Sequence, residues 1–349
     1  MKTYDIAVIE GDGIGPEIIN AAQQVLAAVA DDFALNMTAY EAGAACYERY
    51  GLNMPPETMA ACRAADAIFK GPTGLPNVRL PDGTEAGVLG GVLRNGLDLY
   101  VNLRPIRLYP NVPTALAGRR AGDIDWVMVR ENTEGLYASR GRGIIATNGE
   151  VALDTLLVTR LGTERIVRFA FEEATRRNRK KRVCCVDKSN VLRSMAYFRQ
   201  IFDEVAADYP GIERDYLYVD AAAQALILEP DRFDVIVTEN LFGDILSDLG
   251  GATVGGIGLC AGANLGDEHA YFEPIHGSAP AIAGTGRANP LAAILAGRLM
   301  LDWLGQAQAA RRIEAAVEGA FTERAIRLRA DGSAEAGTSA VLAAILARL

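Results

Sequence analysis

The stretch DIAVIEGDGIGPEIINAAQQVLAAV, residues 5–29, sets the pattern of the fold. Residues 5–9 form a short apolar run that predicts the first strand. Pro16 suits the first turn of a helix, and apolar residues between Ile18 and Val29 recur at helical spacing, which predicts one buried face. The chain therefore opens with a strand followed by a helix.

The same alternation of short β-prone runs and longer helical patterns continues along the chain. It predicts an α/β protein with a largely parallel or mixed sheet flanked by helices. The further predicted strands are residues 65–69, 126–129, 183–186, 216–219 and 235–237.

Polar residues follow four of these strands directly. Because ligands of α/β sheets bind beyond the carboxyl ends of strands, we expect these residues to face a site. They are Arg130-Glu131-Asn132, Asp187-Lys188-Ser189-Asn190, Asp220 and Glu239-Asn240. Residues 140–160 are different, because glycines at 141, 143 and 149 separate their apolar segments, and they predict a hairpin or arm.

Length, charge and cysteine content narrow the class of protein. A chain of 349 residues predicts about two domains. Its formal net charge of −9 argues against non-specific binding to nucleic acid, although a local arginine cluster can still bind a small anion. The sequence predicts neither a signal peptide nor a membrane span. The five cysteines lack metal-ligand spacing, and the adjacent Cys184 and Cys185 lie in an apolar run, which favours free thiols and a cytoplasmic protein.

Three aspartates are candidate metal ligands. Asp244 and Asp248 lie four residues apart on a predicted helix, so both carboxylates project from one face. A divalent cation would relieve their repulsion, whereas the alternative is a carboxylate pair favoured by the helix dipole. Asp220 adds a third hard oxygen ligand of the kind that Mg²⁺ or Mn²⁺ prefers.

Arginines and a lysine are candidates for binding and proton transfer. Arg94, Arg104 and Arg130 are each followed by Asn, Pro or Glu-Asn, and guanidinium groups bind carboxylates in bidentate fashion. A lone arginine is more often a solvated surface residue, but three together indicate a di- or tricarboxylate site. Lys188 could be a general base at a strand-to-helix turn, and Tyr137 could donate the complementary proton, although each alone is more often structural.

Two glycine-containing segments differ in what they predict. The segment from His276 to Pro290 can cradle phosphate with backbone N–H groups. Residues 11–16, GDGIGP, are a poor match to the Rossmann fingerprint, because they end in Gly-Pro and no acid marks the second strand. We therefore expect a fold that is not Rossmann.

Taken together, the motifs resemble the β-decarboxylating hydroxyacid dehydrogenases, which include isocitrate, isopropylmalate, homoisocitrate and tartrate/D-malate dehydrogenases. The resemblance runs from GDGIGPE at residue 11 to the end of the chain. It rests on LRNGLDLYVNLRP (93–105), RENTEGLY (130–137), KSN (188–190), VD (219–220), NLFGDILSDL (240–249) and HGSAPAIAGTGRANP (276–290).

The resemblance implies a fold like that of isopropylmalate dehydrogenase and a division of the chain into two domains. Residues 1–100 with 253–349 would form a large cofactor-binding domain. Residues 101–252 would form a small domain with the metal ligands, the dimer contacts and the arm. Lys188 and Asp220 would reach into the neighbouring subunit's site, so the resemblance also implies a homodimer with shared active sites.

The resemblance also implies roles for particular residues. Arg94, Arg104 and Arg130 would bind the malate carboxylates, Lys188 would assist removal of the hydroxyl proton, and Tyr137 would protonate the enolate left by decarboxylation. Asp220, Asp244 and Asp248 would hold Mg²⁺ or Mn²⁺. Asn190 would touch substrate and nicotinamide, and the other cofactor contacts would be Thr73, His276, Gly277, Ser278, Ala279, Ile282 and Asn289.

Two departures from the family leave the substrate and cofactor open. Val88 and Gly90 replace the Ser and Asn that hold the third carboxylate in isocitrate dehydrogenases. Gly87, Gly90 and Gly91 replace the acid and leucines of isopropylmalate enzymes and leave a wider, neutral wall. We expect 3-isopropylmalate or D-malate/tartrate, with homoisocitrate or isocitrate as the alternative. After HGSAP, NAD enzymes of this family usually have Asp and NADP enzymes have Lys-Tyr, whereas this chain has Ala281-Ile282. Ile282 matches the NAD enzymes, and Arg287 could attract the 2′-phosphate of NADP, so we expect NAD with NADP as the alternative.

Two other functions are alternatives for the same sequence, and each lacks a feature that it would require. A catalytically silent regulatory relative would have eroded metal or base positions, but Asp220, Asp244, Asp248, Lys188 and Tyr137 are all present. A phosphotransferase would need a Walker-type lysine motif, which the sequence lacks.

Overall fold

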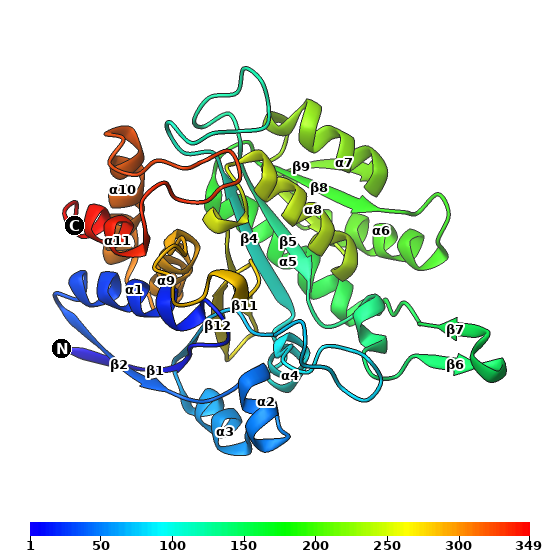
Figure 1. Ribbon diagram of the computed structural model, residues 1–349. Helices are drawn as coiled ribbons and strands as arrows, with labels where there is room; N and C mark the ends of the chain where they lie inside the picture. The colour runs from blue at the N-terminus through cyan, green and yellow to red at the C-terminus, as the bar shows by residue number, and fades with distance from the viewer.

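The computed structural model describes all 349 residues and contains one ten-stranded mixed sheet flanked by helices (Figure 1). Its strand order is β2-β1-β3-β12-β11-β4-β5-β10-β8-β9. The strands are β1 (Lys2–Ile9), β2 (Phe33–Ala39), β3 (Ala67–Lys70), β4 (Val101–Arg107), β5 (Asp125–Glu131), β8 (Arg182–Asp187), β9 (Glu213–Tyr218), β10 (Val235–Thr238), β11 (Ala261–Leu265) and β12 (Ala270–Pro274).

The helices cover both faces of this sheet. They are α1 (Gly15–Ala28), α2 (Ala44–Tyr50), α3 (Pro56–Ala64), α4 (Gly90–Gly96), α5 (Arg160–Arg177), α6 (Arg193–Ala206), α7 (Val219–Leu228), α8 (Asn240–Thr253), α9 (Leu291–Trp303), α10 (Ala307–Thr322) and α11 (Thr338–Leu346). Short 3₁₀ turns lie between them, of which η1 (Leu136–Ser139) carries a candidate residue. None of the helices combines the length and apolar character needed to span a membrane.

The sheet has two parallel sections joined by an antiparallel middle. The strands β2, β1, β3 and β12 run parallel to one another, as do β5, β10, β8 and β9. Between them, β11 is antiparallel to both β12 and β4, and β4 is antiparallel to β5. The mixed sheet confirms the predicted fold class, and its order is not that of a Rossmann fold.

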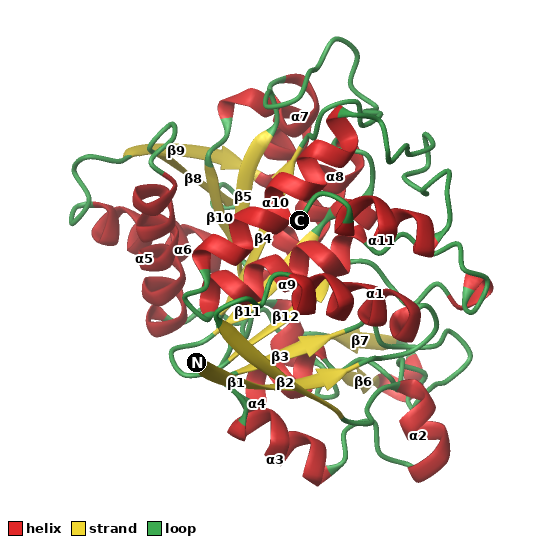
Figure 2. Ribbon diagram, turned by 90° about the vertical axis from the view of Figure 1, so that its left-hand side faces the viewer, coloured by secondary structure: helices red, strands yellow, loops and turns green.

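Alternation along the strands decides which helices each face meets. Ile6 and Val8 of β1 belong to the core under α1 and α9, whereas Ala7 and Ile9 pack with residues of α3 and α4. In the other section α8 packs on β4 and β5, and α5 packs on the opposite face of β5 and β10 (Figure 2). The sheet is therefore buried on both sides, as continuous apolar strands require.

Residues 144–153 form a separate hairpin that projects from the body of the molecule (Figure 1). Its strands are β6 (Ile144–Ala146) and β7 (Val151–Leu153), which pair only with each other. Four apolar side chains of this hairpin, Ile144, Ile145, Val151 and Leu153, are exposed. The hairpin lies within the segment in which the sequence predicts an arm.

The predicted strands agree with the structure within a few residues, with one difference that concerns the candidate site. Asp220 lies in the first turn of α7, two residues after β9 ends, and not at the end of a strand. The apolar run of α7 begins directly after β9, so the helix starts one residue before Asp220. All five cysteines are free and buried, as the sequence predicts.

Candidate active site

Four elements bring the candidate arginines and two candidate metal ligands together. Arg94 lies on α4, Arg104 within β4 and Arg130 near the end of β5. Asp244 and Asp248 lie on α8, which packs on these two strands. Arg94 and Asp248 are separated by more than 150 residues in the sequence, so the strand order of the sheet, and not proximity along the chain, creates this cluster.

Asp244 is the centre of the cluster. It forms an ion pair with Arg130, and Arg104 Nη2 lies 3.2 Å from its Oδ1. The hydroxyl of Tyr137, on η1, donates a hydrogen bond of 2.9 Å to its Oδ2. Asp248 is more exposed and lies 3.5 Å from Arg104 Nη1. The two carboxylates on one face of α8 thus meet two buried guanidinium groups.

Electrostatics keep Asp244 ionised. Burial alone would raise the pKa of Asp244, but the guanidinium groups of Arg130 and Arg104 outweigh burial and lower that pKa. The pKa of Asp248 is raised, first by burial and then by the charge of Asp244. The pKa of Arg130 is lowered by burial and by Arg104 and Arg94 beside it. Arg130 thus lies among cations that Asp244 offsets only in part, and such a group of cations favours an anionic ligand.

Buried asparagines orient the arginines, a role that the sequence pattern does not predict. Asn264 Oδ1 accepts hydrogen bonds from Arg94 Nε at 3.2 Å, Asn102 Nδ2 at 2.8 Å and Asn132 Nδ2 at 3.0 Å. Asn102 Oδ1 accepts one from Arg104 Nε at 2.9 Å. The asparagine at the start of α8, residue 240, accepts two from Arg130. A buried amide is costly without partners, so these residues rigidify the guanidinium groups.

Arg94 is further held by β12. Its Nε donates to the Tyr271 hydroxyl at 3.0 Å, and its Nη2 lies 3.6 Å from Glu273. Lys70 Nζ also pairs with Glu273, at 2.7 Å. A polar residue within an apolar strand is the signal that could have identified Glu273, because a buried carboxylate needs a cationic partner.

The remaining catalytic candidates form a separate pair within one chain. Lys188 Nζ lies 2.7 Å from Asp220 Oδ1. Nowhere does the single chain bring three His, Cys, Asp or Glu side chains close enough to hold a metal ion. The expectation that Asp220 joins Asp244 and Asp248 is therefore not met within one subunit. Asn190, in the same turn as Lys188, is exposed.

The candidate cofactor residues surround a loop junction. Ile14 N donates to Ser278 O at 2.8 Å, and the Ser278 hydroxyl donates to Gly74 O, next to Thr73. Asp12 is buried and accepts hydrogen bonds from Ala44 N and Gly74 N. The segment GDGIGP thus binds the neighbouring loops, which agrees with its rejection as a dinucleotide fingerprint.

Residues 279–287 of the 276–290 segment lie mostly on the surface. Gly277, Gly284 and Gly286 have no atom within 4 Å of an added Cβ, and Ala279 has a positive φ of 37°. Burial lowers the pKa of His276. Asn289 accepts a hydrogen bond from Leu291 N at the start of α9. Ile282 is half-buried. The free space above Gly277, Gly284 and Gly286 leaves room for a nucleotide to bind along this loop.

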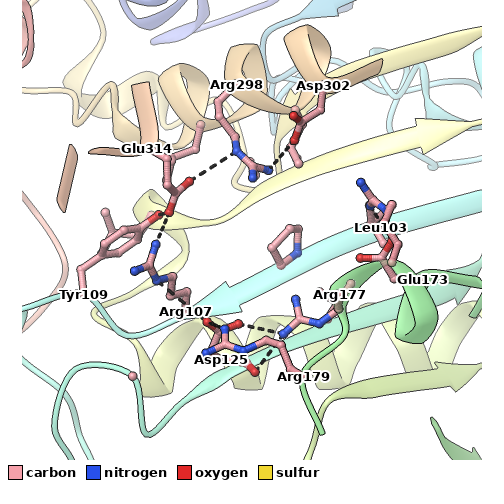
Figure 3. Close-up of a pocket in the computed structure, with 18 residues that line it drawn as sticks. Leu103, Arg107, Tyr109, Asp125, Glu173, Arg177, Arg179, Arg298, Asp302 and Glu314 are labelled. Carbon is pink, nitrogen blue, oxygen red and sulfur yellow. Dashed lines mark hydrogen bonds and ion pairs between the residues drawn. The ribbon is translucent and has the colours of Figure 1, made fainter. Parts of the chain in front are cut away.

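A further cavity lies elsewhere. It measures about 450 Å³ and is lined by side chains of β4, β5, α5, α9 and α10 (Figure 3). Arg107 and Leu103 face this cavity, whereas Arg104 on the same strand points to α8, so the cavity is on the opposite face of the sheet. Ion pairs such as Arg298 with Asp302 and Arg177 with Asp125 neutralise its charges. It offers no free catalytic group, and we assign the site to the arginine cluster.

Comparison with known proteins agrees with this assignment. The family model described as isocitrate/isopropylmalate dehydrogenase matches residues 5–345. The chain is 45% identical to the 3-isopropylmalate dehydrogenase of Beutenbergia cavernae over 100% of this chain and 99% of the relative. It is 47% identical to that of Thermobifida fusca, with 93% of each chain covered.

Solved structures of similar fold belong to the same kind of enzyme, but they are named as an isocitrate dehydrogenase and a β-decarboxylating dehydrogenase. The isocitrate dehydrogenase of Methylococcus capsulatus has a TM-score of 0.89 and 40% identity and covers 99% of both chains. The apo β-decarboxylating dehydrogenase of Thermococcus kodakarensis has a TM-score of 0.80 and 40% identity over 99% of this chain and 96% of that one. The similar proteins therefore share one fold but carry the names of more than one substrate.

Proposed function

The chain belongs to the isocitrate/isopropylmalate dehydrogenase family and is a dehydrogenase, and we propose that it catalyses metal-dependent oxidative decarboxylation of a malate-type 2-hydroxy acid with NAD. The observation that carries this proposal is the arrangement of Arg104, Arg130 and Tyr137 around the Asp244 carboxylate. It combines anion-binding groups, hard oxygen ligands and a proton donor in one place.

Asp244 and Asp248 fit a divalent cation such as Mg²⁺ or Mn²⁺. Both are carboxylates, which are the ligands that hard cations prefer, and both project from one face of α8. Asp220 would complete the set from a second subunit. When bound, the cation would lower the pKa of the substrate hydroxyl and stabilise the negative charge that develops on decarboxylation.

The chain's own side chains would bind the substrate and move its protons. Arg94, Arg104 and Arg130 would bind the substrate carboxylates, since guanidinium groups stay charged when buried. As the substrate enters, its carboxylates would replace part of the ion pairing of Arg104 and Arg130 with Asp244. Lys188 of a second subunit would accept the hydroxyl proton. Tyr137, already hydrogen-bonded at its hydroxyl, would then give a proton to the enolate carbon.

Two features support the proposal of a homodimer with shared sites. The Lys188–Asp220 pair lies apart from Asp244 within one chain, so it would act on a partner's site. Exposed apolar side chains of the hairpin and of α7 and α8, such as Ile145, Leu228 and Ile245, would be covered by the partner. Such an enzyme would work in the cytoplasm, because its free cysteines suit a reducing compartment.

We also propose that the two sections of the sheet correspond to two domains. Residues 1–100 and 253–349 carry β1, β2, β3, β11 and β12, and residues 101–252 carry the other five main strands. The first would hold the cofactor through Thr73, Asn289 and the 276–282 segment: His276, Gly277, Ser278, Ala279 and Ile282. Asn190 of the partner would also touch the nicotinamide. Arg287 is exposed beside this segment, and NADP is therefore the second cofactor to test.

The names of the relatives favour 3-isopropylmalate as a substrate, and the resemblance of the sequence motifs adds D-malate and tartrate as candidates. The test is a panel of 3-isopropylmalate, D-malate, tartrate, homoisocitrate and isocitrate with NAD or NADP and Mg²⁺ or Mn²⁺. Reduction of cofactor at 340 nm should occur with at least one pair. If every pair fails, the substrate class is wrong.

Asp244→Asn tests the metal assignment. It should lower kcat by about 10²-fold or more, because it removes a charged ligand from the reacting centre. Asp208→Asn is the matched control, since it removes a carboxylate from an exposed pair with Arg168 of α5. Full metal-dependent activity in Asp244→Asn would overturn the assignment.

A further inference from the structure

The first turn of α4 contains two consecutive glycines, Gly90 and Gly91, that the backbone does not require. Neither has a positive φ, and glycine within a helix costs about 1 kcal/mol relative to alanine. The reason for glycine is the space above this turn. A Cβ at Gly91 would lie 2.8 Å from Nη1 of Arg140, and one at Gly90 would lie 3.4 Å from the guanidinium carbon of Arg94.

Arg140 therefore occupies the wall that the sequence predicts to be wide and neutral, and that expectation is corrected here. It follows η1, two residues after Ala138, and its guanidinium lies over the Tyr137 ring at 5.4 Å. Gly91, Arg94, Asn132 and Tyr137 line the same small pocket. The wall is positively charged, not neutral.

Arg140 differs from the other arginines of the site in its partners. Arg104 and Arg130 pair with Asp244, and Arg94 lies near Glu273. The Arg140 side chain makes no hydrogen bond and no ion pair, and it is exposed toward the pocket. Burial of its inner part and the charge of Arg94 both lower its pKa, so a counter-charge is missing here. An anion in this pocket would supply it.

We propose that Arg140 is a specificity-determining residue that binds a carboxylate on the C3 substituent of the substrate. The inference rests on the proposed function, in which Arg94, Arg104 and Arg130 bind the two malate carboxylates. It adds a binding group for a third carboxylate on the substrate. An alkyl substituent would meet glycines and an unpaired guanidinium, which offer little apolar surface and would lose hydration. A substituent that ends in a carboxylate would form a charge-assisted pair instead. The chain then prefers tricarboxylic over alkyl-substituted 2-hydroxy acids.

Kinetics on substrates that share the malate core test the proposal. For wild type, kcat/KM for isocitrate or homoisocitrate should exceed that for 3-isopropylmalate. Arg140→Leu should lower the ratio of kcat/KM for the tricarboxylate to kcat/KM for 3-isopropylmalate by about 10²-fold. Most of this change should be a higher KM for the tricarboxylate. Arg142→Leu is the matched control, because it removes a nearby exposed arginine that does not line the pocket; its ratio should stay that of wild type.

A second variant approaches the same space from α4. Gly91→Leu would displace the flexible end of Arg140 and add apolar surface, so the ratio should shift toward 3-isopropylmalate. Circular dichroism and thermal unfolding would verify that both variants fold. A wild-type preference for the alkyl substrate that Arg140→Leu leaves unchanged would overturn the proposal.

Binding separates this inference from the proposed function. Propane-1,2,3-tricarboxylate cannot be oxidised at a hydroxyl, and calorimetry can measure its affinity without turnover. Its Kd should rise at least about 10-fold in Arg140→Leu and stay unchanged in Arg142→Leu. If no substrate is turned over, the proposed function fails, and this binding difference alone decides the role of Arg140. Equal affinity in all three proteins contradicts that role.

Discussion

Gly13 shows how a single residue joins the loops of the candidate cofactor site. Its φ of +59° is strained for other residues, and an added Cβ would collide with the backbone carbonyl oxygen of Ser278. Gly83 has a similar φ of +85° but open space around it. We expect Gly13→Ala to lower the free energy of unfolding by about 2 kcal/mol more than Gly83→Ala, because only the first adds a clash to the strain.

Urea unfolding would measure this difference, and the KM for NAD should rise in Gly13→Ala alone. Equal destabilisation of the two variants would mean that the contact with Ser278 gives way at no cost.

Glu273 links the substrate arginine to the stability of the fold at low pH. Burial alone would raise its pKa, but Lys70 and Arg94 outweigh burial and lower it from 4.5 to about 2. Because the pKa is depressed in the folded state, the stabilisation is present above pH 4.5 and is lost as pH falls toward 2. The difference corresponds to about 3 kcal/mol.

We expect Glu273→Gln to be less stable than wild type at pH 7 and to lose less stability between pH 5 and pH 2.5, in a series of urea titrations. Glu268→Gln removes an exposed carboxylate from the adjacent turn and should keep the wild-type slope. Parallel pH profiles for wild type and Glu273→Gln would contradict the assignment of the low pKa.

At the scale of elements, the hairpin of β6 and β7 has no packing partner in its own chain. Ile145 is 76% exposed, so Ile145→Asp should leave the fold of the subunit intact while it introduces a charge into the proposed dimer contact. We expect this variant to sediment as a monomer and to lose nearly all activity, since the sites would be shared.

Asn148→Asp is the matched control, because it adds the same charge at the exposed tip of the hairpin, between the two strands. A dimeric and fully active Ile145→Asp would show that the hairpin takes no part in assembly.

Elements differ in how well the sequence predicts them. Apolar runs such as those of β5 and β8 are predicted within a few residues, because burial on both faces leaves a continuous apolar pattern. The strands β11 and β12 are not predicted, since Gly262, Asn264 and Pro274 interrupt their pattern. Yet Asn264 is tolerated there because it hydrogen-bonds Arg94 and two asparagines.

The whole molecule limits prediction of the site in a different way. The sequence motifs predict Arg94, Arg104, Arg130, Asp244 and Asp248 as site residues, because charged residues at the ends and turns of elements point to ligands. The motifs do not predict the proposed role of Arg140, since its position depends on the room left at Gly91, about fifty residues earlier in the sequence. Such a contact is a property of the tertiary structure, and no local pattern carries it.

The division of the site between subunits can be tested with mixed dimers. In the proposed arrangement one site takes Asp244 and Asp248 from one chain and Asp220 from the other. A dimer of one Asp244→Asn chain and one Asp220→Asn chain then has one site with both changes and one site with neither. Random mixing by co-expression should therefore restore about a quarter of wild-type activity, although each variant alone is inactive.

The matched control is a mixture of Asp244→Asn with Asp248→Asn. These residues lie on the same α8 helix, so every site of the mixed dimer would keep one of the two changes, and activity should not return. Recovery only in the first mixture requires that Asp220 and Asp244 act in one site from different chains. No recovery in either mixture would mean that each chain builds its site alone, and the Lys188–Asp220 pair would then need another role.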